Sequence, residues 1–126
     1  MTSSGIPTDG VQPADGSGLS MWNTTTAEAT VALLKTMATN KVFRDALPVG
    51  GVDGTLKARF PASEHKGKVL AKTGTLSVSS CLSGYVITAN GETIVFSILM
   101  NHFDRKTGSA AARRAQDDIV RYLLSL

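Results

Sequence analysis

The residues with the clearest potential for chemistry are Lys72, Thr73, Gly74 and Thr75, which follow one another in an apolar, strand-like stretch. Side chains alternate between the two faces of a strand, and glycine lets another backbone approach closely. An edge strand of this kind can pair with an extended peptide. Lys72 would then supply positive charge beside the reacting centre, Thr73 or Thr75 would donate to a carboxylate, and a strand N–H would face a developing oxyanion. The same residues also fit an ordinary strand with a solvated lysine.

These residues need a sheet to hold them, and the segment 68–101 is rich in the aliphatic residues that favour one. It predicts three strands, the first over residues 69–77 and the others over 81–88 and 93–101. Asn90 and Gly91 separate the last two segments, and this pair favours a type I′ hairpin turn. The last two strands are therefore expected to be antiparallel neighbours.

Two helices are expected to cover this sheet. Thr25 and Glu28 have the spacing of a capping box, and apolar residues then recur at helical intervals to a predicted end near Asn40. After Gly108 a second helix is expected to face the sheet with one apolar stripe, and to turn Arg113, Asp117 and Asp118 outward. That stripe comprises Ala112, Ala115, Ile119, Tyr122, Leu123 and Leu126. The turn-rich segment 41–66 has room only for short helical turns. The fold class is α+β, with an antiparallel sheet of about three strands packed against helices.

Composition excludes several classes of function. The chain has 126 residues and a net charge of +3 that is spread along it, so neither a nucleic-acid partner nor a second domain is expected. No apolar run reaches the roughly 20 residues of a membrane span, and the N-terminus lacks the features of a signal peptide. The single cysteine, Cys81, has no partner for a disulfide or a zinc site. We expect no metal or cofactor, and a flexible tail over residues 1–14.

Several other residues have reactive side chains, but their sequence contexts favour structural roles in loops and turns. Ser63 and Lys66 have the spacing of a nucleophile and its base, yet they lie in a turn-rich loop rather than at a helix start. His65 and His102 have no carboxylate or cysteine at ligand or triad spacing. Asp15 and Asp53 precede glycines and are expected in turns, and Ser20 in a loop hydrogen bond.

Lys-Thr-Gly is one of three signatures of penicillin-binding proteins and serine β-lactamases, and here it stands within VLAKTGTLSVSSCLSGYVITANGETIVFSILMNH. This stretch resembles the C-terminal strands of the D-alanyl-D-alanine carboxypeptidases of the DacB type (peptidase family S13). DGSGLS at residues 15–20, with Asn23 following, and GGVDGTLKARF at residues 50–60 resemble the same family in the same order. Met21 stands where an arginine is common. The resemblance covers the chain from Asp15 onward and implies part of the transpeptidase fold shared by penicillin-binding proteins and serine β-lactamases.

The resemblance implies an acyl-transfer site. In the family, a serine attacks the peptide bond between two D-alanines, a lysine one helical turn along acts as base, and water releases the acyl-enzyme. Carried over by position, Lys72, Thr73 and Gly74 are the catalytic third motif, and the Thr75 N–H belongs to the oxyanion hole. Thr75 and Ser77, with Thr73, contact the substrate. The expected ligands are a peptidoglycan stem peptide ending in D-Ala-D-Ala and β-lactams, and the expected location is periplasmic or extracytoplasmic.

The departure from the family concerns the nucleophile. The family's Ser-x-x-Lys and Ser-x-Asn motifs precede the DGSGLS block, so residues 15–126 are expected to form only the C-terminal part of a carboxypeptidase domain, silent by itself. The missing N-terminal part, or a second copy pairing at the exposed edge of the first strand, is the expected partner. Two alternatives remain: a peptide-binding module that uses the same strand, and a remnant that binds nothing.

Overall fold

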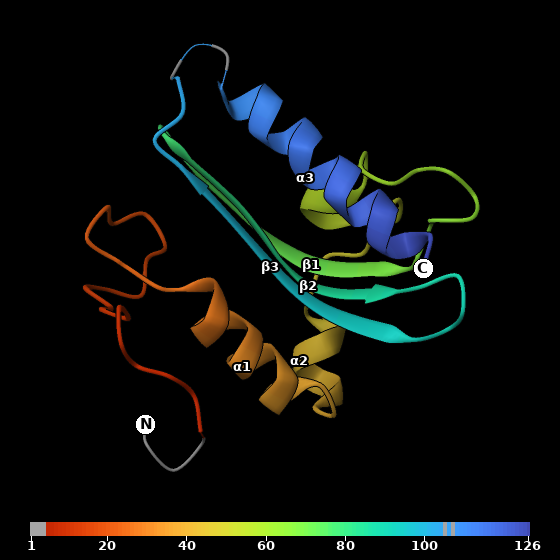
Figure 1. Cartoon of the computed structure of the whole chain (residues 1–126), viewed down its shortest axis with the longest axis horizontal. Helices are drawn as coiled ribbons and strands as arrows, with labels where there is room; N and C mark the ends of the chain where they lie inside the picture. Colours follow the sequence, from red (N-terminus) through yellow and green to blue (C-terminus); the bar gives the residue numbers. More distant parts are fainter. Residues whose placement is uncertain (1–4, 105, 107) are drawn as a thin grey trace.

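Three antiparallel strands lie between helices in the computed structural model, which describes residues 5–104, 106 and 108–126 (Figure 1). The strands are β1 (Val69–Leu76), β2 (Ser79–Ile87) and β3 (Thr93–Asn101), in the order β1-β2-β3. Helices α1 (Ala27–Met37) and α2 (Lys41–Asp45) lie on one side of the sheet, and α3 (Gly108–Leu124) lies on the other. A short 3-10 helix, η2 (Gly54–Leu56), precedes β1. The predicted α+β class and the three strands are confirmed.

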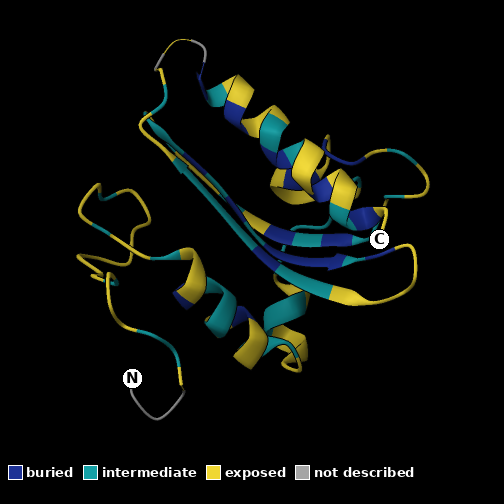
Figure 2. Ribbon diagram, in the orientation of Figure 1, coloured by how far each residue is buried: buried dark blue, intermediate teal, exposed yellow. Residues whose placement is uncertain are grey.

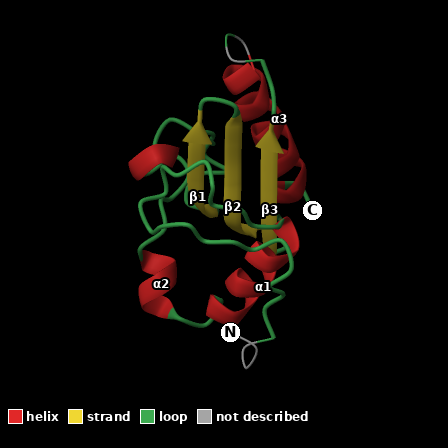
Figure 3. Ribbon diagram, turned by 90° about the vertical axis from the view of Figure 1, so that its left-hand side faces the viewer, coloured by secondary structure: helices red, strands yellow, loops and turns green. Residues whose placement is uncertain are grey.

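The register of β1 and β2 decides which residues share a face. Lys72 lies opposite Ser83, and Thr75 lies opposite Ser80. The strand ends at Leu76, so Ser77 lies in the turn that leads into β2 rather than in the strand. Figure 3 shows the three strands side by side, with β1 at one edge and β3 at the other.

The loop between β2 and β3 differs from the predicted type I′ turn. The strands are antiparallel neighbours as expected, but they are joined by residues 88–92. Gly91 N–H donates to Thr88 O at 3.0 Å, and Thr88 N–H donates to Glu92 O at 2.9 Å. Gly91 has φ +82°, whereas Asn90 is not among the described residues with positive φ. The extra loop length lets a turn across residues 88–91 end in one left-handed glycine, so a second positive φ is not needed.

The main core lies between the sheet and α3, and Figure 2 shows buried residues on both. It comprises Leu56, Phe60, Val69, Ala71, Leu82, Val86, Phe96, Val120 and Leu124. The buried side of α3 consists of Gly108, Ala112, Gln116, Val120 and Leu124. The predicted stripe is therefore wrong at Ile119, Tyr122 and Leu126, which are 43%, 66% and 42% exposed, and Leu126 lies beyond the end of the helix. The physical reason is that the polar residue Gln116 is buried and hydrogen-bonded. The buried side of the helix therefore passes through Gln116 and Val120, and Ile119 and Tyr122 point outward.

Helix α1 begins and ends close to its predicted limits. Its N-cap is Thr26, whose hydroxyl accepts from Ala29 N–H at 3.1 Å, so the predicted capping box at Thr25 is wrong by one residue. The helix ends at Met37, and Asn40 instead caps α2 through its side-chain oxygen.

A buried tyrosine fixes α1 to the sheet. Tyr85 of β2 is fully buried, and its hydroxyl donates to Leu34 O at 2.6 Å. The Arg44 guanidinium lies 5.2 Å from the Tyr85 ring centroid, so the end of α2 contacts the same residue. Between α1 and β1 the chain forms only short helical turns, as predicted.

The segment before α1 is held by short-range polar contacts. Gln12 and Thr24 pair through their backbones, and Ser20 Oγ accepts from Trp22 N–H as expected for a loop residue. The Asp15 carboxylate accepts from Ser17 and Asn23, and these hydrogen bonds hold its pKa below the usual value. Asp15 thus has the predicted turn role. The flexible tail over residues 1–14 stays a prediction, and residues 1–4 lie outside the described part. No described helix is long and apolar enough to cross a bilayer.

Candidate active site

Strand β1 has one edge that is paired along its whole length and one that is closed only at its start. The paired edge faces β2. At the outer edge Gly50 N–H donates to Val69 O at 2.8 Å, and Ala71 N–H donates to Pro48 O at 3.0 Å. Past Ala71, no described residue makes a backbone hydrogen bond to this outer edge. The second half of β1 therefore has room for another strand.

The alternation of the strand identifies which groups line the open edge. Val69 and Ala71 direct their peptide groups outward, so Thr73 and Thr75, two and four residues further, do the same. The Thr75 N–H thus points to the open edge. The carbonyl of Thr73 accepts a hydrogen bond from the ammonium group of Lys72 at 2.7 Å.

The charged and hydroxyl side chains of β1 lie on opposite faces. Thr73 and Thr75 share the face of the buried residues Val69 and Ala71, which is the face that α3 covers. Lys72 lies on the other face and is exposed. Gly74 lies beside Cys81, and a Cβ built on Gly74 would be at an ordinary 3.7 Å from the Cys81 Cβ. Packing within this chain therefore does not require a glycine at position 74.

A hollow of about 320 Å³ adjoins the open half of β1 on the α3 side. Its lining combines hydroxyl, amide and guanidinium side chains: Thr55, Ala58, Arg59, Thr73, Thr75, Ser80, Cys81, Arg113 and Gln116. The Thr73 hydroxyl donates to the Thr55 hydroxyl at 3.0 Å, which ties β1 to the 3-10 helix η2. The two threonines singled out by the sequence therefore share a concave surface with groups from η2, β2 and α3.

A buried polar chain holds one wall of this hollow. The Arg59 guanidinium donates to the Asp117 carboxylate, with nitrogen–oxygen distances of 2.8 and 2.6 Å, and to Gln116 Oε1 at 3.3 Å. Gln116 Nε2 then donates to Ser80 Oγ at 3.1 Å. Asp117 was expected outside the helix's buried side, but its side chain is only 16% exposed because it pairs with Arg59. Sequence reasoning missed this series of hydrogen bonds, because the residues that form it are 36 to 58 positions apart along the polypeptide.

Ser63, Lys66 and Asp53 do not line this hollow, and they lie in loops and turns as the sequence predicts. Ser63 is exposed in a loop, where its hydroxyl donates to Glu64, and neither it nor Lys66 is helical. Asp53 accepts from Val49 N–H at 2.7 Å in a turn. Within the described ranges no group of three or more His, Cys, Asp or Glu side chains could hold a metal ion.

Cys81 lines the hollow but is poorly suited to attack a substrate. Its partial burial raises the pKa of the thiol above the usual 9.0, although a hydrogen bond with the Met100 backbone partly opposes this increase. A thiol with a raised pKa is neutral at physiological pH, and only the thiolate is a strong nucleophile.

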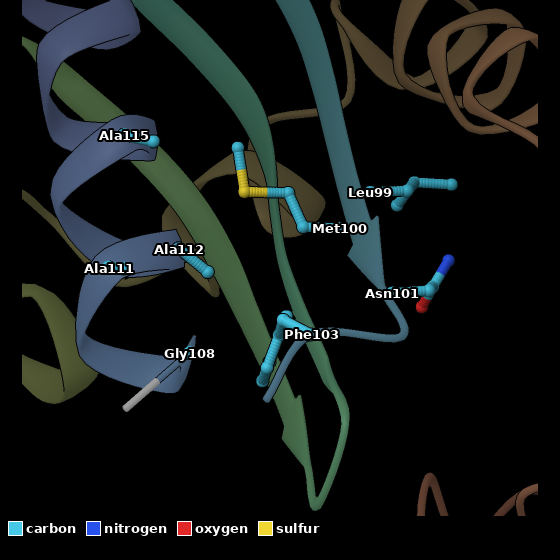
Figure 4. A pocket seen from close by; sticks show the side chains of 8 residues that line it. All are labelled: Leu99, Met100, Asn101, Phe103, Gly108, Ala111, Ala112 and Ala115. Atoms are coloured by element: carbon cyan, nitrogen blue, oxygen red, sulfur yellow. The ribbon is translucent and has the colours of Figure 1, made fainter. Parts of the chain in front are cut away.

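A second, larger hollow of about 560 Å³ lies between the end of β3 and the start of α3 (Figure 4). In Figure 4 the side chains of Met100, Phe103 and Ala112 point into it, whereas Leu99 and Asn101 point away. The described residues that line it are mainly alanine, methionine and phenylalanine, and none of these described residues is titratable. They supply no reactive group, so the hollow beside β1 is taken as the candidate site.

The sheet, its covering helices and the open-edged strand define a penicillin-binding protein fold. The crystal structure of penicillin-binding protein 4 (dacB) from Haemophilus influenzae matches 99% of this chain with a TM-score of 0.83 and 26% identity. A second structure of the same protein, complexed with a novel β-lactam, matches 94% of the chain with a TM-score of 0.77 and 26% identity.

The chain belongs to the D-Ala-D-Ala carboxypeptidase 3 (S13) family, whose model matches residues 1–125. A D-alanyl-D-alanine carboxypeptidase from an Actinomadura species is 42% identical over 105 residues, which cover 77% of this chain. The family resemblance drawn from the sequence is confirmed, but its expected extent is wrong, because the match begins at residue 1 and not at Asp15. The chain spans 19% of that relative and 30% of each of the two Haemophilus structures.

Proposed function

We propose that this chain supplies the substrate-docking strand of a serine-type D-Ala-D-Ala carboxypeptidase, with Lys72, Thr73 and Gly74 as its catalytic motif. Thr75 and Ser77 contact the substrate in this proposal. The observation that carries it is the outer edge of β1, where the Thr75 N–H has no backbone partner among the described residues. Family membership and the Haemophilus structure with a bound β-lactam support the same reading, including β-lactams as ligands.

The proposed chemistry has two acyl-transfer steps. A stem peptide lies along the open half of β1, and the Thr75 N–H donates to the carbonyl oxygen of the penultimate D-alanine. A serine hydroxyl, supplied by polypeptide outside the described residues, attacks that carbonyl carbon. The lysine base of the same upstream polypeptide takes the serine proton and passes it to the amine of the terminal D-alanine. The C–N bond then breaks, D-alanine leaves and an ester remains. Water then hydrolyses the ester and restores the serine. Lys72, exposed on the other face, contributes positive charge beside this serine.

The second proposed partner surface is the outer edge of β3. His102 N–H donates to Val78 O, so even-numbered peptide groups of β3 point to β2 and odd-numbered ones point outward. The strand contains neither a charged residue nor a proline, which are the usual protections of an edge. The sequence placed the exposed edge at the first strand, but segment 48–50 closes part of that edge. We propose that upstream polypeptide of the same enzyme, or failing that a second copy, pairs with β3.

The test of the docking strand is a titration of the ¹⁵N-labelled chain with acetyl-D-Ala-D-Ala, followed by nuclear magnetic resonance. The amides of Thr73 and Thr75 should shift, whereas that of Ser63, in its exposed loop, should not. An absence of shifts along β1 at saturating peptide would overturn the proposal.

The test of catalysis adds the upstream polypeptide of the Haemophilus protein and measures D-alanine release. Release should exceed that of either part alone and should be lost in Lys72→Ala, but kept in the control Ser63→Ala. Peptide-induced chemical-shift changes along β1 without any release of D-alanine would instead favour a peptide-binding module. An extracytoplasmic location belongs to the same proposal, because peptidoglycan lies outside the cytoplasmic membrane.

A further inference from the structure

We infer that Arg113 of α3 is a specificity-determining residue, whose guanidinium receives the C-terminal carboxylate of the peptide docked on β1. This inference rests on the proposed function, because it takes the open half of β1 as the docking strand. The inference adds to the docking strand a cation from α3, some forty residues further along the chain. It predicts that the site binds a peptide with a free C-terminal carboxylate more tightly than the corresponding C-terminal amide.

The charges around the hollow single out Arg113. Of the described residues that line the hollow, two carry guanidinium groups, Arg59 and Arg113, and none carries a carboxylate. Arg59 is buried and its charge is already balanced by Asp117. Arg113 is exposed, and within the described part of the chain it makes no hydrogen bond, ion pair or ring contact. Within this described lining, Arg113 is therefore the cation whose charge is not balanced.

The buried polar chain holds the helix so that Arg113 shares the hollow with the threonines. Arg113 lies three residues before Gln116, so both are on the same side of α3. Gln116 donates to Ser80, and Ser80 is the cross-strand partner of Thr75. The turn of α3 that carries Arg113 is thus fixed against the part of the sheet that carries the Thr75 side chain.

The chemistry of the lining matches a carboxylate rather than a neutral group. A guanidinium presents a planar set of N–H donors that bind both oxygens of a carboxylate. The hydroxyl of Thr75 adds a donor on the same face of β1, whereas the Thr73 hydroxyl already donates to Thr55. Lys72 cannot fill this role, because its side chain lies on the opposite face of the strand. The two cations are therefore divided, with Lys72 beside the reacting centre and Arg113 beside the carboxylate.

The test compares Arg113→Gln with the matched control Arg114→Gln in the whole chain. Arg114 is the next residue of α3, is also exposed and carries the same charge, but it points about 100° away around the helix and is not among the residues that line the hollow. Each variant is titrated with acetyl-D-Ala-D-Ala and with its C-terminal amide, and binding is followed at the Thr75 amide and at the arginine Nε–H resonances. Arg113→Gln should weaken binding of the carboxylate peptide about tenfold, since a charge-assisted hydrogen bond is lost. Binding of the amide should not change.

Each outcome decides the inference. Tenfold weakening in Arg113→Gln for the carboxylate peptide alone, with Arg114→Gln like the parent chain, supports it. Equal binding of acid and amide by the parent chain, or equal loss in both variants, overturns it and leaves the docking strand intact. If neither peptide shifts the Thr75 amide of the parent chain, both the docking strand and the inference fall.

Discussion

Replacing Asp117 by alanine tests whether the ion pair with Arg59 holds the wall of the hollow. The two side chains are 16% and 9% exposed, and their closest nitrogen–oxygen distance is 2.6 Å. At an effective dielectric constant of about 20, unit charges at that separation attract by about 6 kcal/mol. Much of this attraction offsets the cost of taking both charges out of water.

The expected loss follows from what alanine leaves behind. Without Asp117, the Arg59 charge stays in a mostly buried position with only Gln116 as partner. Breaking a buried pair by removing one partner typically lowers the free energy of unfolding by about 3 to 5 kcal/mol. Asp117→Asn keeps an acceptor for the guanidinium, so we expect a smaller loss of about 1 to 3 kcal/mol.

The assay is urea unfolding at pH 7 followed by far-ultraviolet circular dichroism. The matched control is Asp118→Ala, which removes the neighbouring carboxylate from an exposed pair with Arg121 and should cost less than about 1 kcal/mol. If Asp117→Ala unfolds the chain outright, Asp117→Asn still ranks the two positions. Equal losses at positions 117 and 118 would refute the argument that burial makes this pair matter.

Three further predictions concern the sheet. Gly84→Ala should cost about 3 kcal/mol or more in urea unfolding, because the added Cβ would overlap the backbone oxygen of Leu70 in β1. Gly74→Ala should change stability by less than about 1 kcal/mol, because the nearest atom to its Cβ, the Cβ of Cys81, lies at 3.7 Å. Similar losses in the two variants would contradict this. Tyr85→Phe leaves the buried carbonyl of Leu34 without its hydrogen-bond donor, so the free energy of unfolding should fall by about 1 to 3 kcal/mol in the same assay. No measurable fall would count against a stabilising hydrogen bond between Tyr85 and Leu34. Burial raises the pKa of the Cys81 thiol, so the folded state binds the thiol proton more tightly than the unfolded state, and the free energy of unfolding should fall as pH rises past 9.0. Iodoacetamide at pH 8 should also alkylate Cys81 more slowly in the folded chain than in the urea-unfolded chain. Equal alkylation rates would refute this prediction.

Local pattern was sufficient for most elements of this fold. The aliphatic segments predicted three strands and their antiparallel order, because alternation and turn residues act over a few positions. The errors are local as well. Thr25 and Thr26 are adjacent hydroxyl residues, either of which can cap a helix, and Asn90-Gly91 fits more than one loop length.

The face of α3 shows where a hydrophobic pattern stops being sufficient. A pattern of apolar residues treats glutamine as outward, yet Gln116 is buried because Ser80 and Arg59 satisfy its amide. Those partners are brought to it only by the tertiary fold. For the same reason the sequence singled out the strand with Lys72 but not the arginines opposite it, which come from separate segments.

The hollow beside β1 is built from three separate stretches of the chain, so its lining is complete only in the fully folded protein. Residues 55–59, the β1–β2 hairpin and α3 must all pack together before the hollow exists. A partly folded chain that pairs β1 with β2 but has not docked α3 would display the β1 edge without Arg113 and Gln116. Any recognition that depends on Arg113 therefore begins only after α3 has docked.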